Sequence, residues 1–140
     1  MKPPESKPFD RQQSEALMAA AREASARAYA PYSRFQVGAA VLADDGRVFT
    51  AANVENASYG LTSCAERNAI FAAVSAGVRC IVVVAIHTPT EQPVSPCGAC
   101  RQVIHEFGPQ ALVVSCCDGE GHGQWPIEEL LPRAFGPGNL

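Results

Sequence analysis

The sequence predicts an α/β fold with three layers, α/β/α, in which a central mixed sheet of about five strands carries helices on both faces. Three observations predict it. An Asp-Gly pair at residues 45–46 separates two strand-like runs, as in a β-hairpin. The apolar runs 80–86 and 111–116 show no polar alternation, which is typical of strands buried on both faces of a parallel sheet. Segments with helical spacing alternate with these runs, so crossover connections are expected.

The first half of the chain is expected to form a helix and then a hairpin. Apolar side chains recur at helical spacing over residues 11–28, behind an Asp10 that can cap the helix. Strands are expected at 35–43 and 47–54, because both runs are rich in Val, Phe and Thr. A polar loop then extends to Gly60.

The second half alternates helices with buried strands. Both of its longer helices are expected to stop at a glycine, Gly77 or Gly108. In chain order we expect a helix at 64–76, a strand at 80–86, a helix at 97–107, a strand at 111–116, a loop at 119–123 and a short helix at 126–131. The whole predicts a single domain over residues 10–135, between a flexible tail of residues 1–9 and a C-terminal tail of residues 136–140.

Composition excludes several classes of function. The net charge is −3 and no block is rich in Lys and Arg, so a nucleic-acid partner is not expected. No run approaches the roughly 20 apolar residues that span a bilayer, and the first residues carry charge and proline where a signal peptide has an apolar core. We therefore expect a cytoplasmic protein without a membrane partner.

Two short runs, Cys-Ala-Glu at 64–66 and Pro-Cys-Gly-Ala-Cys at 96–100, contain candidate metal ligands. The i, i+3 spacing of Cys97 and Cys100 puts both sulfurs on one face of a helix start. A helix N-terminus stabilises negative charge by roughly 0.3–1 kcal/mol, which favours the thiolates that zinc requires. Three thiolates, including that of Cys64, leave the fourth tetrahedral position of zinc free, which indicates a catalytic rather than a structural site.

The residues after Cys64 add a carboxylic acid and a cation, Glu66 and Arg67. Glu66 leans back toward such a metal from the first helical turn and fits a proton shuttle better than a fourth ligand. Zinc with three thiolates carries a net charge of −1, so a cation is expected beside the sulfurs. Arg67 is the first choice for that role and Arg101 the second, while an ordinary solvated charge is the alternative for Arg67.

Other interpretations of the cysteines remain open. A lone Cys-x-x-Cys also occurs in redox pairs and structural zinc knuckles, but a thioredoxin-like site would leave Cys64 and Glu66 without a purpose. A non-catalytic zinc-stabilised interaction module would need a closed site. The other three cysteines, Cys80, Cys116 and Cys117, are expected to be small core residues.

Four motifs together resemble the small, homotetrameric class of cytidine deaminases. They are YAPYSRFQVGAA at 29–40, NVENASYG at 53–60, CAER at 64–67 and PCGACRQ at 96–102. The resemblance covers about residues 10–135. It implies a cytidine deaminase-like fold and the zinc-dependent, hydrolytic deamination of cytidine and deoxycytidine to uridine and deoxyuridine, with release of ammonia, as in pyrimidine salvage.

The resemblance also implies a role for each site residue. Cys64, Cys97 and Cys100 would hold one Zn²⁺ per chain, and Glu66 would protonate N3 of cytosine and then the leaving amino group. The implied substrate contacts are Asn53 and Glu55 to the ribose hydroxyls, Phe35 against the nucleoside, the backbone at Ala65 and Ser95 to the base and its amino group, Ala57 and Tyr59 reaching into a neighbouring subunit's site, and Phe135 covering the base in a neighbouring site.

Some of these roles have simpler alternatives. Asn53 and Glu55 could merely end a strand, Phe35 could be plain core, and Phe135 could pack on its own subunit. Arg133 stands where the family's C-terminal segment has a glycine. The family implies a homotetramer with sites shared between subunits and a small nucleoside substrate. A sister deaminase of another aminopyrimidine nucleoside, such as blasticidin S, is the alternative enzyme.

Overall fold

The structure, a computed structural model, describes residues 10–140, so the tail expected at residues 1–9 lies outside it. Its elements are α1 (Arg11–Ser25), β1 (Gly38–Ala43), β2 (Val48–Ala52), α2 (Ala65–Ser75), β3 (Ile81–Thr88), α3 (Gly98–Phe107), β4 (Leu112–Cys117), β5 (Gly123–Pro126) and α4 (Ile127–Leu130), with 3-10 turns at Tyr59–Leu61 and Pro137–Asn139. Within the described part of the chain, no helix combines the length and apolar character needed to cross a membrane.

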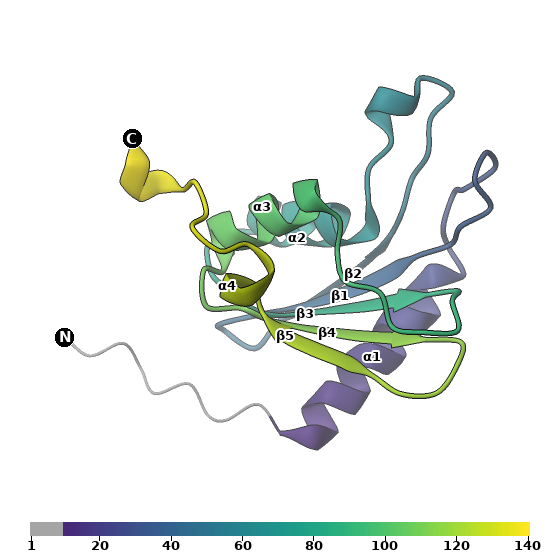
Figure 1. The fold of residues 1–140 in the computed structure, drawn as a ribbon, viewed down its shortest axis with the longest axis horizontal. Coiled ribbons are helices and arrows are strands. Elements are labelled where there is room, and N and C mark those ends of the chain that lie inside the picture. Colours follow the sequence, from purple (N-terminus) through teal and green to yellow (C-terminus); the bar gives the residue numbers. More distant parts are fainter. Residues whose placement is uncertain (1–9) are drawn as a thin grey trace.

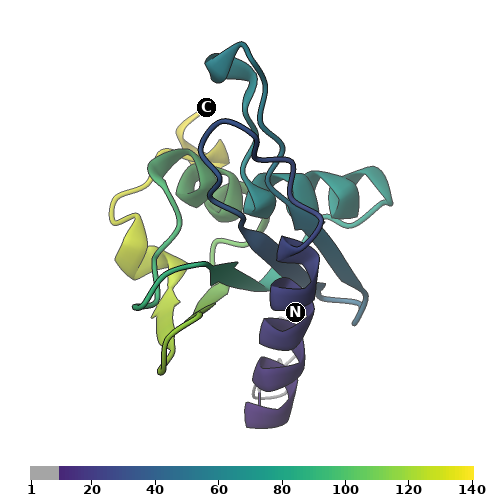
Figure 2. The ribbon, with the colours of Figure 1, turned by 90° about the vertical axis from the view of Figure 1, so that its right-hand side faces the viewer.

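The five strands form one mixed sheet in the order β2-β1-β3-β4-β5. Strands β3 and β4 are parallel, and the other three neighbouring pairs are antiparallel. Helix α1 covers one face of the sheet, and α2 and α3 cover the other (Figures 1 and 2). The predicted three-layer α/β fold is therefore confirmed.

Each face of the sheet has its own hydrophobic core. Along β3, Val84 and Ile86 belong to the core under α2 and α3, whereas Val83 and Ala85 belong to the core under α1. Alternate side chains of a strand point to opposite faces, so a strand between two helical layers needs apolar residues throughout. This explains why residues 81–86 lack polar alternation.

Helix α1 packs very closely on the first residue of β1, Gly38. A Cβ atom added at Gly38 would lie 1.8 Å from the carbonyl oxygen of Ala21 and 2.5 Å from the amide nitrogen of Ser25. Backbone atoms cannot yield to such a contact, so only glycine allows this approach. The small residues on the inner face of α1 serve the same packing, since Ala21 and Ala24 are fully buried.

The ends of the first elements differ from the sequence prediction. Helix α1 stops at Ser25 rather than at residue 28, because Tyr29 has already turned to donate its N–H to the carbonyl of Asn53 at 3.0 Å. Strand β1 starts at Gly38 rather than at residue 35. The Asn53 side chain instead bonds the backbone before it, accepting from Val37 N–H at 2.9 Å and donating to Phe35 C=O at 2.7 Å.

The C-terminal half holds two further differences. Strand β5 pairs antiparallel with β4 where a loop and a helix start were expected, and α4 is correspondingly shorter than predicted. A four-residue edge strand that starts with glycine and ends with proline carries little strand signal. Cys116 and Cys117 are buried as predicted, but the prediction for Cys80 was wrong: this thiol is exposed, because β3 begins one residue later.

Candidate metal and substrate site

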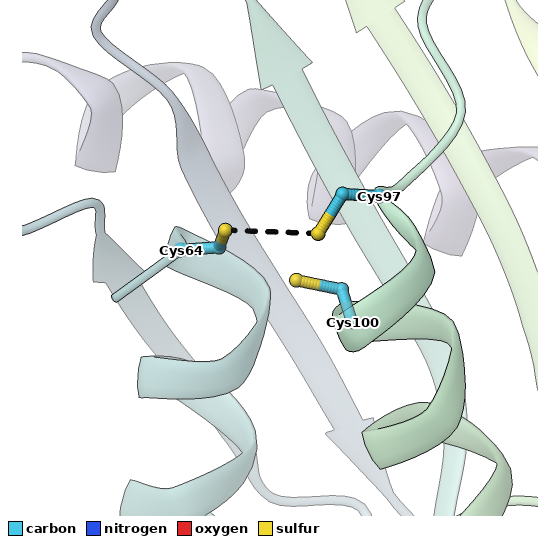
Figure 3. A group of neighbouring side chains, drawn as sticks. All are labelled: Cys64, Cys97 and Cys100. Atoms are coloured by element: carbon cyan, nitrogen blue, oxygen red, sulfur yellow. Dashed lines mark hydrogen bonds between the residues drawn. The ribbon is translucent and has the colours of Figure 1, made fainter. Parts of the chain in front are cut away.

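Three thiol side chains meet between the N-terminal ends of α2 and α3, with their sulfurs pointing toward one another (Figure 3). Cys64 is the N-cap residue of α2, Cys97 is the N-cap residue of α3, and Cys100 lies in the first turn of α3. All three sulfurs lie within 4.8 Å of one another, and those of Cys64 and Cys97 are 3.8 Å apart. The fold thus brings together two runs that are far apart in the sequence.

This donor set fits zinc. Tetrahedral zinc with Zn–S bonds of about 2.3 Å sets neighbouring sulfurs about 3.8 Å apart, which is the separation of Cys64 and Cys97. Among residues 10–140, the group contains these three thiols and no fourth His, Cys, Asp or Glu. Three protein ligands leave one coordination position for water or substrate, which is the arrangement of catalytic zinc sites.

The thiols differ in their acidity before a metal is considered. The pKa of Cys64 is lowered to about 5, first because Cys100 shares a hydrogen bond with it and then because the guanidinium of Arg67 lies beside it. Arg67 Nη2 donates to Cys64 Sγ at 3.4 Å. The same contact with Cys64 raises the pKa of Cys100. A thiolate is therefore already favoured at one ligand position.

Of the two candidate cations, Arg67 is the one that the structure places against sulfur. The guanidinium of Arg101 instead donates to three oxygen atoms, those of Pro96, Ser95 and Leu130. One buried atom of Arg67, Nε, has no hydrogen-bond partner among the described residues. Arg67 is thus oriented by the thiols rather than by solvent, which disfavours the solvated-charge interpretation.

Glu66 supplies the acid of the site. Its side chain is only 5% exposed in the first turn of α2, and it lines the same cavity as Cys64 and Cys97. Burial raises the pKa of Glu66, because the charged carboxylate loses its hydration. A carboxyl that is more easily protonated than in water can both accept and return a proton, as a proton shuttle must.

The cavity beside the thiols has a volume of about 260 Å³. Four of the predicted substrate contacts line it, namely Phe35, Asn53, Ala65 and Ser95. The sequence analysis missed six further lining residues, which are Val37, Thr62, Ile86, Thr88, Val94 and Pro96. A signal existed for Thr88, which ends β3, because open α/β sheets bind ligands beyond the carboxyl ends of their strands.

Asn53 and Glu55 shape the wall that carries Phe35. The Glu55 carboxylate accepts hydrogen bonds from the amides of Tyr32 and Ser33 at 3.0 and 3.1 Å and from the Ser33 hydroxyl. The Ser33 hydroxyl, followed by these amides, lowers the pKa of Glu55. Phe35 is 41% exposed at the cavity, so the plain-core interpretation of this residue is wrong.

Four predicted substrate contacts do not line the cavity of their own chain, namely Glu55, Ala57, Tyr59 and Phe135. Ala57 is exposed, and the exposed fractions of Tyr59 and Phe135 are 75% and 60%. The segment with the Tyr59–Leu61 turn projects from the body of the molecule (Figures 1 and 2). Phe135 has an exposed side chain although Gln102 holds its carbonyl at 2.8 Å, so it does not pack into its own core.

Comparisons with known proteins agree with this geometry. The family model of the cytidine and deoxycytidylate deaminase zinc-binding region matches residues 11–116, a range that includes both cysteine runs. The cytidine deaminase of Sporosarcina psychrophila is 47% identical over 127 residues, 90% of this chain and 93% of that protein. That of Halalkalibacterium halodurans is 52% identical over 120 residues, 85% of this chain and 91% of that protein. The crystal structure of cytidine deaminase from Burkholderia pseudomallei matches with a TM-score of 0.84 and 48% identity, covering 86% of this chain and 98% of that one.

Proposed function

The chain belongs to the cytidine and deoxycytidylate deaminase family, and from that premise we propose that it deaminates cytidine and deoxycytidine to uridine and deoxyuridine. Each turnover consumes one water and releases one ammonia. The observation that carries the proposal is that a cluster of three thiols lies beside a buried carboxyl, Glu66, and that two of these thiols line one cavity with Glu66. The enzyme is zinc-dependent, and its place is in pyrimidine salvage.

Glu66 moves the protons of the reaction. Cys64, Cys97 and Cys100 would hold one zinc ion per chain, which when bound supplies a Lewis acid that makes water more acidic. Glu66 takes the first proton of the water and delivers it to N3 of the pyrimidine. It then takes the second proton and delivers it to the amino group, which leaves as ammonia while the oxygen stays on C4.

The cavity walls bind the nucleoside. We assign the ribose hydroxyls to Asn53 and Glu55, the face of the nucleoside to Phe35, and the base with its amino group to the backbone at Ala65 and Ser95. Asn53 uses one N–H and one lone pair on the backbone near Phe35. An amide has two of each, so a second donor and a second acceptor remain for ribose.

A homotetramer with shared sites would complete the cavity. Ala57, Tyr59 and Phe135 are exposed in the single chain, which is what contacts to a neighbouring subunit's site require. In the single chain the Tyr59 ring meets the Tyr32 ring edge-on, with the centroids 5.8 Å apart, and most of the Tyr59 side chain stays exposed. A partner surface would bury Tyr59 and Phe135. Light scattering should give the mass of four chains of 14.8 kDa. A monomer with full activity would contradict the sharing of sites.

We further propose one catalytic domain over residues 10–135 and a cytoplasmic location. Both cores and all ligand residues lie within this range. Thiol ligands must stay reduced, and reducing conditions prevail in the cytoplasm. A fragment of residues 10–135 that folds and binds zinc tests the first point, and cell fractionation tests the second.

One experiment tests the function. The purified protein is analysed for zinc and assayed for ammonia release with cytidine, deoxycytidine, their nucleotides and blasticidin S. Glu66→Gln should keep one zinc per chain and lose turnover, whereas Glu106→Gln, on the exposed side of α3, should behave as wild type. Near-wild-type turnover by Glu66→Gln would contradict the mechanism. Activity on blasticidin S alone would favour the sister deaminase, and zinc without any turnover would favour an interaction module.

A further inference from the structure

We propose that Arg101 is a positioning residue that joins one wall of the substrate cavity to the C-terminal segment, defined here as residues 130–135. Through this connection Arg101 sets how tightly the nucleoside is held. The inference rests on the proposed function for the identity of the nucleoside, and on contacts of the described residues for the connection itself.

The guanidinium of Arg101 bonds two parts of the chain at once. Its Nε donates to the carbonyl of Pro96 at 2.7 Å and its Nη2 donates to the hydroxyl of Ser95 at 2.8 Å. Its Nη1 donates to the carbonyl of Leu130 at 2.8 Å. Arginine presents its donors in a planar, rigid fork, so three acceptors on different segments are fixed relative to one another.

The wall in question is an irregular loop that needs such support. Val94, Ser95 and Pro96 line the cavity consecutively, between the end of β3 and the start of α3. Ser115, which is fully buried in β4, donates its hydroxyl to Val94 C=O at 2.8 Å and accepts from Val94 N–H at 3.2 Å. The wall is therefore anchored to the sheet at one end and to Arg101 at the other.

The C-terminal segment is held by the same helix. It leaves α4 at Leu130 and runs beside α3 (Figure 1). Gln102 donates from Nε2 to the carbonyl of Phe135 at 2.8 Å, and a Cβ atom at Gly136 would lie 3.0 Å from His105 Nε2. Only Arg101 among these α3 residues also bonds the cavity wall, so it alone couples the segment to the wall.

This position gives Arg101 a different task from Arg67. All three hydrogen bonds of the Arg101 side chain have oxygen acceptors. Among residues 10–140, its guanidinium donates no hydrogen bond to a thiol sulfur. Loss of Arg101 should loosen Ser95 and the C-terminal segment together while the metal ligands stay in place. The signature of the proposal is thus a weaker hold on the nucleoside in a protein that retains its zinc.

The test compares Arg101→Met and Arg101→Lys with Gln102→Ala in the zinc-loaded protein. Hydrogen exchange is followed in peptides covering 93–97 and 130–135, alongside zinc content, KM and kcat for cytidine. Arg101→Met should speed exchange in both peptides and keep one zinc per chain. It should raise KM by about tenfold, with a smaller fall in kcat, because the hydrogen bonds from the charged guanidinium are lost. Arg101→Lys should fall between Arg101→Met and wild type, because an ammonium group lacks the planar fork.

Gln102→Ala is the matched control, because Gln102 holds the C-terminal segment without touching the wall. It should speed exchange in 130–135 and leave 93–97 unchanged. The proposal is overturned if Arg101→Met leaves exchange in 93–97 unchanged, or if it loses zinc and lowers kcat at constant KM. Should Arg101→Met not fold, Arg101→Lys is judged by the same peptides. Hydrogen exchange is measured without substrate, so its result does not depend on which nucleoside the enzyme uses. If the wild-type protein fails to turn over cytidine, the proposed function is refuted, and the exchange data still test the connection made by Arg101.

Discussion

Two regions around the cavity are built in opposite ways. The ligand centre is formed by residues at the starts of two helices, and the outer rim by residues on exposed segments. The first consists of Cys64, Glu66, Cys97 and Cys100, and the second of Ala57, Tyr59 and Phe135. The ligand centre rests on a core in which residues of α2 and α3 are fully buried, whereas the side chains of Tyr59 and Phe135 are mostly in solvent.

The difference separates chemistry from enclosure. Within a single chain, the helix N-termini and the neighbouring guanidinium favour thiolate at the ligand centre, and burial raises the pKa of Glu66. Nothing within residues 10–140 covers the outer rim, whose parts would be completed by neighbouring chains in the proposed tetramer. Changes at the ligand centre should therefore abolish the reaction, and changes at the outer rim should weaken substrate binding while zinc remains.

The largest effect is expected at the ligand centre itself. Cys100→Ala should lose zinc and lower turnover by more than about a thousandfold, because a Lewis acid contributes several kcal/mol to catalysis. Zinc binding also contributes to folding, so the variant should unfold at lower urea. Metal analysis, turnover and urea unfolding measure the three effects. Cys116→Ala is the control, because Cys116 is also a buried cysteine but lies outside the thiol cluster. If the Cys116→Ala variant also lost zinc, the loss in Cys100→Ala would reflect a general disturbance of the core rather than the removal of a metal ligand.

A smaller effect is expected from the cation beside the thiols. In zinc-free protein the pKa of Cys64 is about 5, so this thiol should be alkylated rapidly at neutral pH, with a rate that falls only as the pH drops through that value. Arg67→Gln removes a nearby positive charge, which should move the midpoint upward by roughly one pKa unit or more. The measurement is the rate of alkylation against pH, with the modified residue identified by mass spectrometry. An unchanged midpoint would mean that Arg67 does not stabilise the thiolate.

The outer rim should respond more mildly, and between chains. Tyr59→Ala should keep its zinc and raise KM for cytidine by about tenfold, the loss expected for a buried aromatic contact of roughly 1–2 kcal/mol. Its sharper test is mixing with Glu66→Gln chains. If Tyr59 acts on a neighbour's site, some sites in mixed oligomers combine an intact ligand centre with an intact outer rim, and the mixture should recover low KM. A mixture with no recovery would place Tyr59 outside any shared site.

The sequence predicts the ligand centre far better than the walls around it. Cys64, Cys97, Cys100 and Glu66 are residue types with few purposes, and they stand at the starts of two helices whose ends are marked in the sequence by glycines. Arg101 and Ser115 bind backbone carbonyls of segments far away in the sequence, those of Leu130 and Val94. A carbonyl has no residue identity, so such a contact leaves no mark in the sequence and appears only in the folded chain.

The same reasoning explains the errors in the fold. The three layers follow from the uninterrupted apolar runs of β3 and β4 and from the Asp-Gly turn, which are local signals. The start of β1 depends on the Asn53 side chain, which competes with the strand ladder for the backbone at Phe35 and Val37. Strand β5 forms because it pairs with the free edge of β4, and its own four residues carry no signal for this pairing. Non-local interactions of this kind decide where β1 begins and whether β5 forms at all, whereas the types of the other elements follow from local signals.

The smallest effect is expected from backbone strain at Arg133, in the segment that carries Phe135 of the outer rim. Arg133 adopts φ 54°, a left-handed conformation that costs a non-glycine residue about 1–2 kcal/mol. Arg133→Gly relieves that cost but makes the unfolded chain more flexible, so the net gain should be roughly 0.5–1 kcal/mol in the free energy of unfolding. Urea unfolding of zinc-loaded protein measures it. Arg133→Ala removes the side chain and keeps the strain, so it should give no gain. If both variants are equally stabilised, the arginine side chain and not the backbone is the source of instability in the segment that carries Phe135.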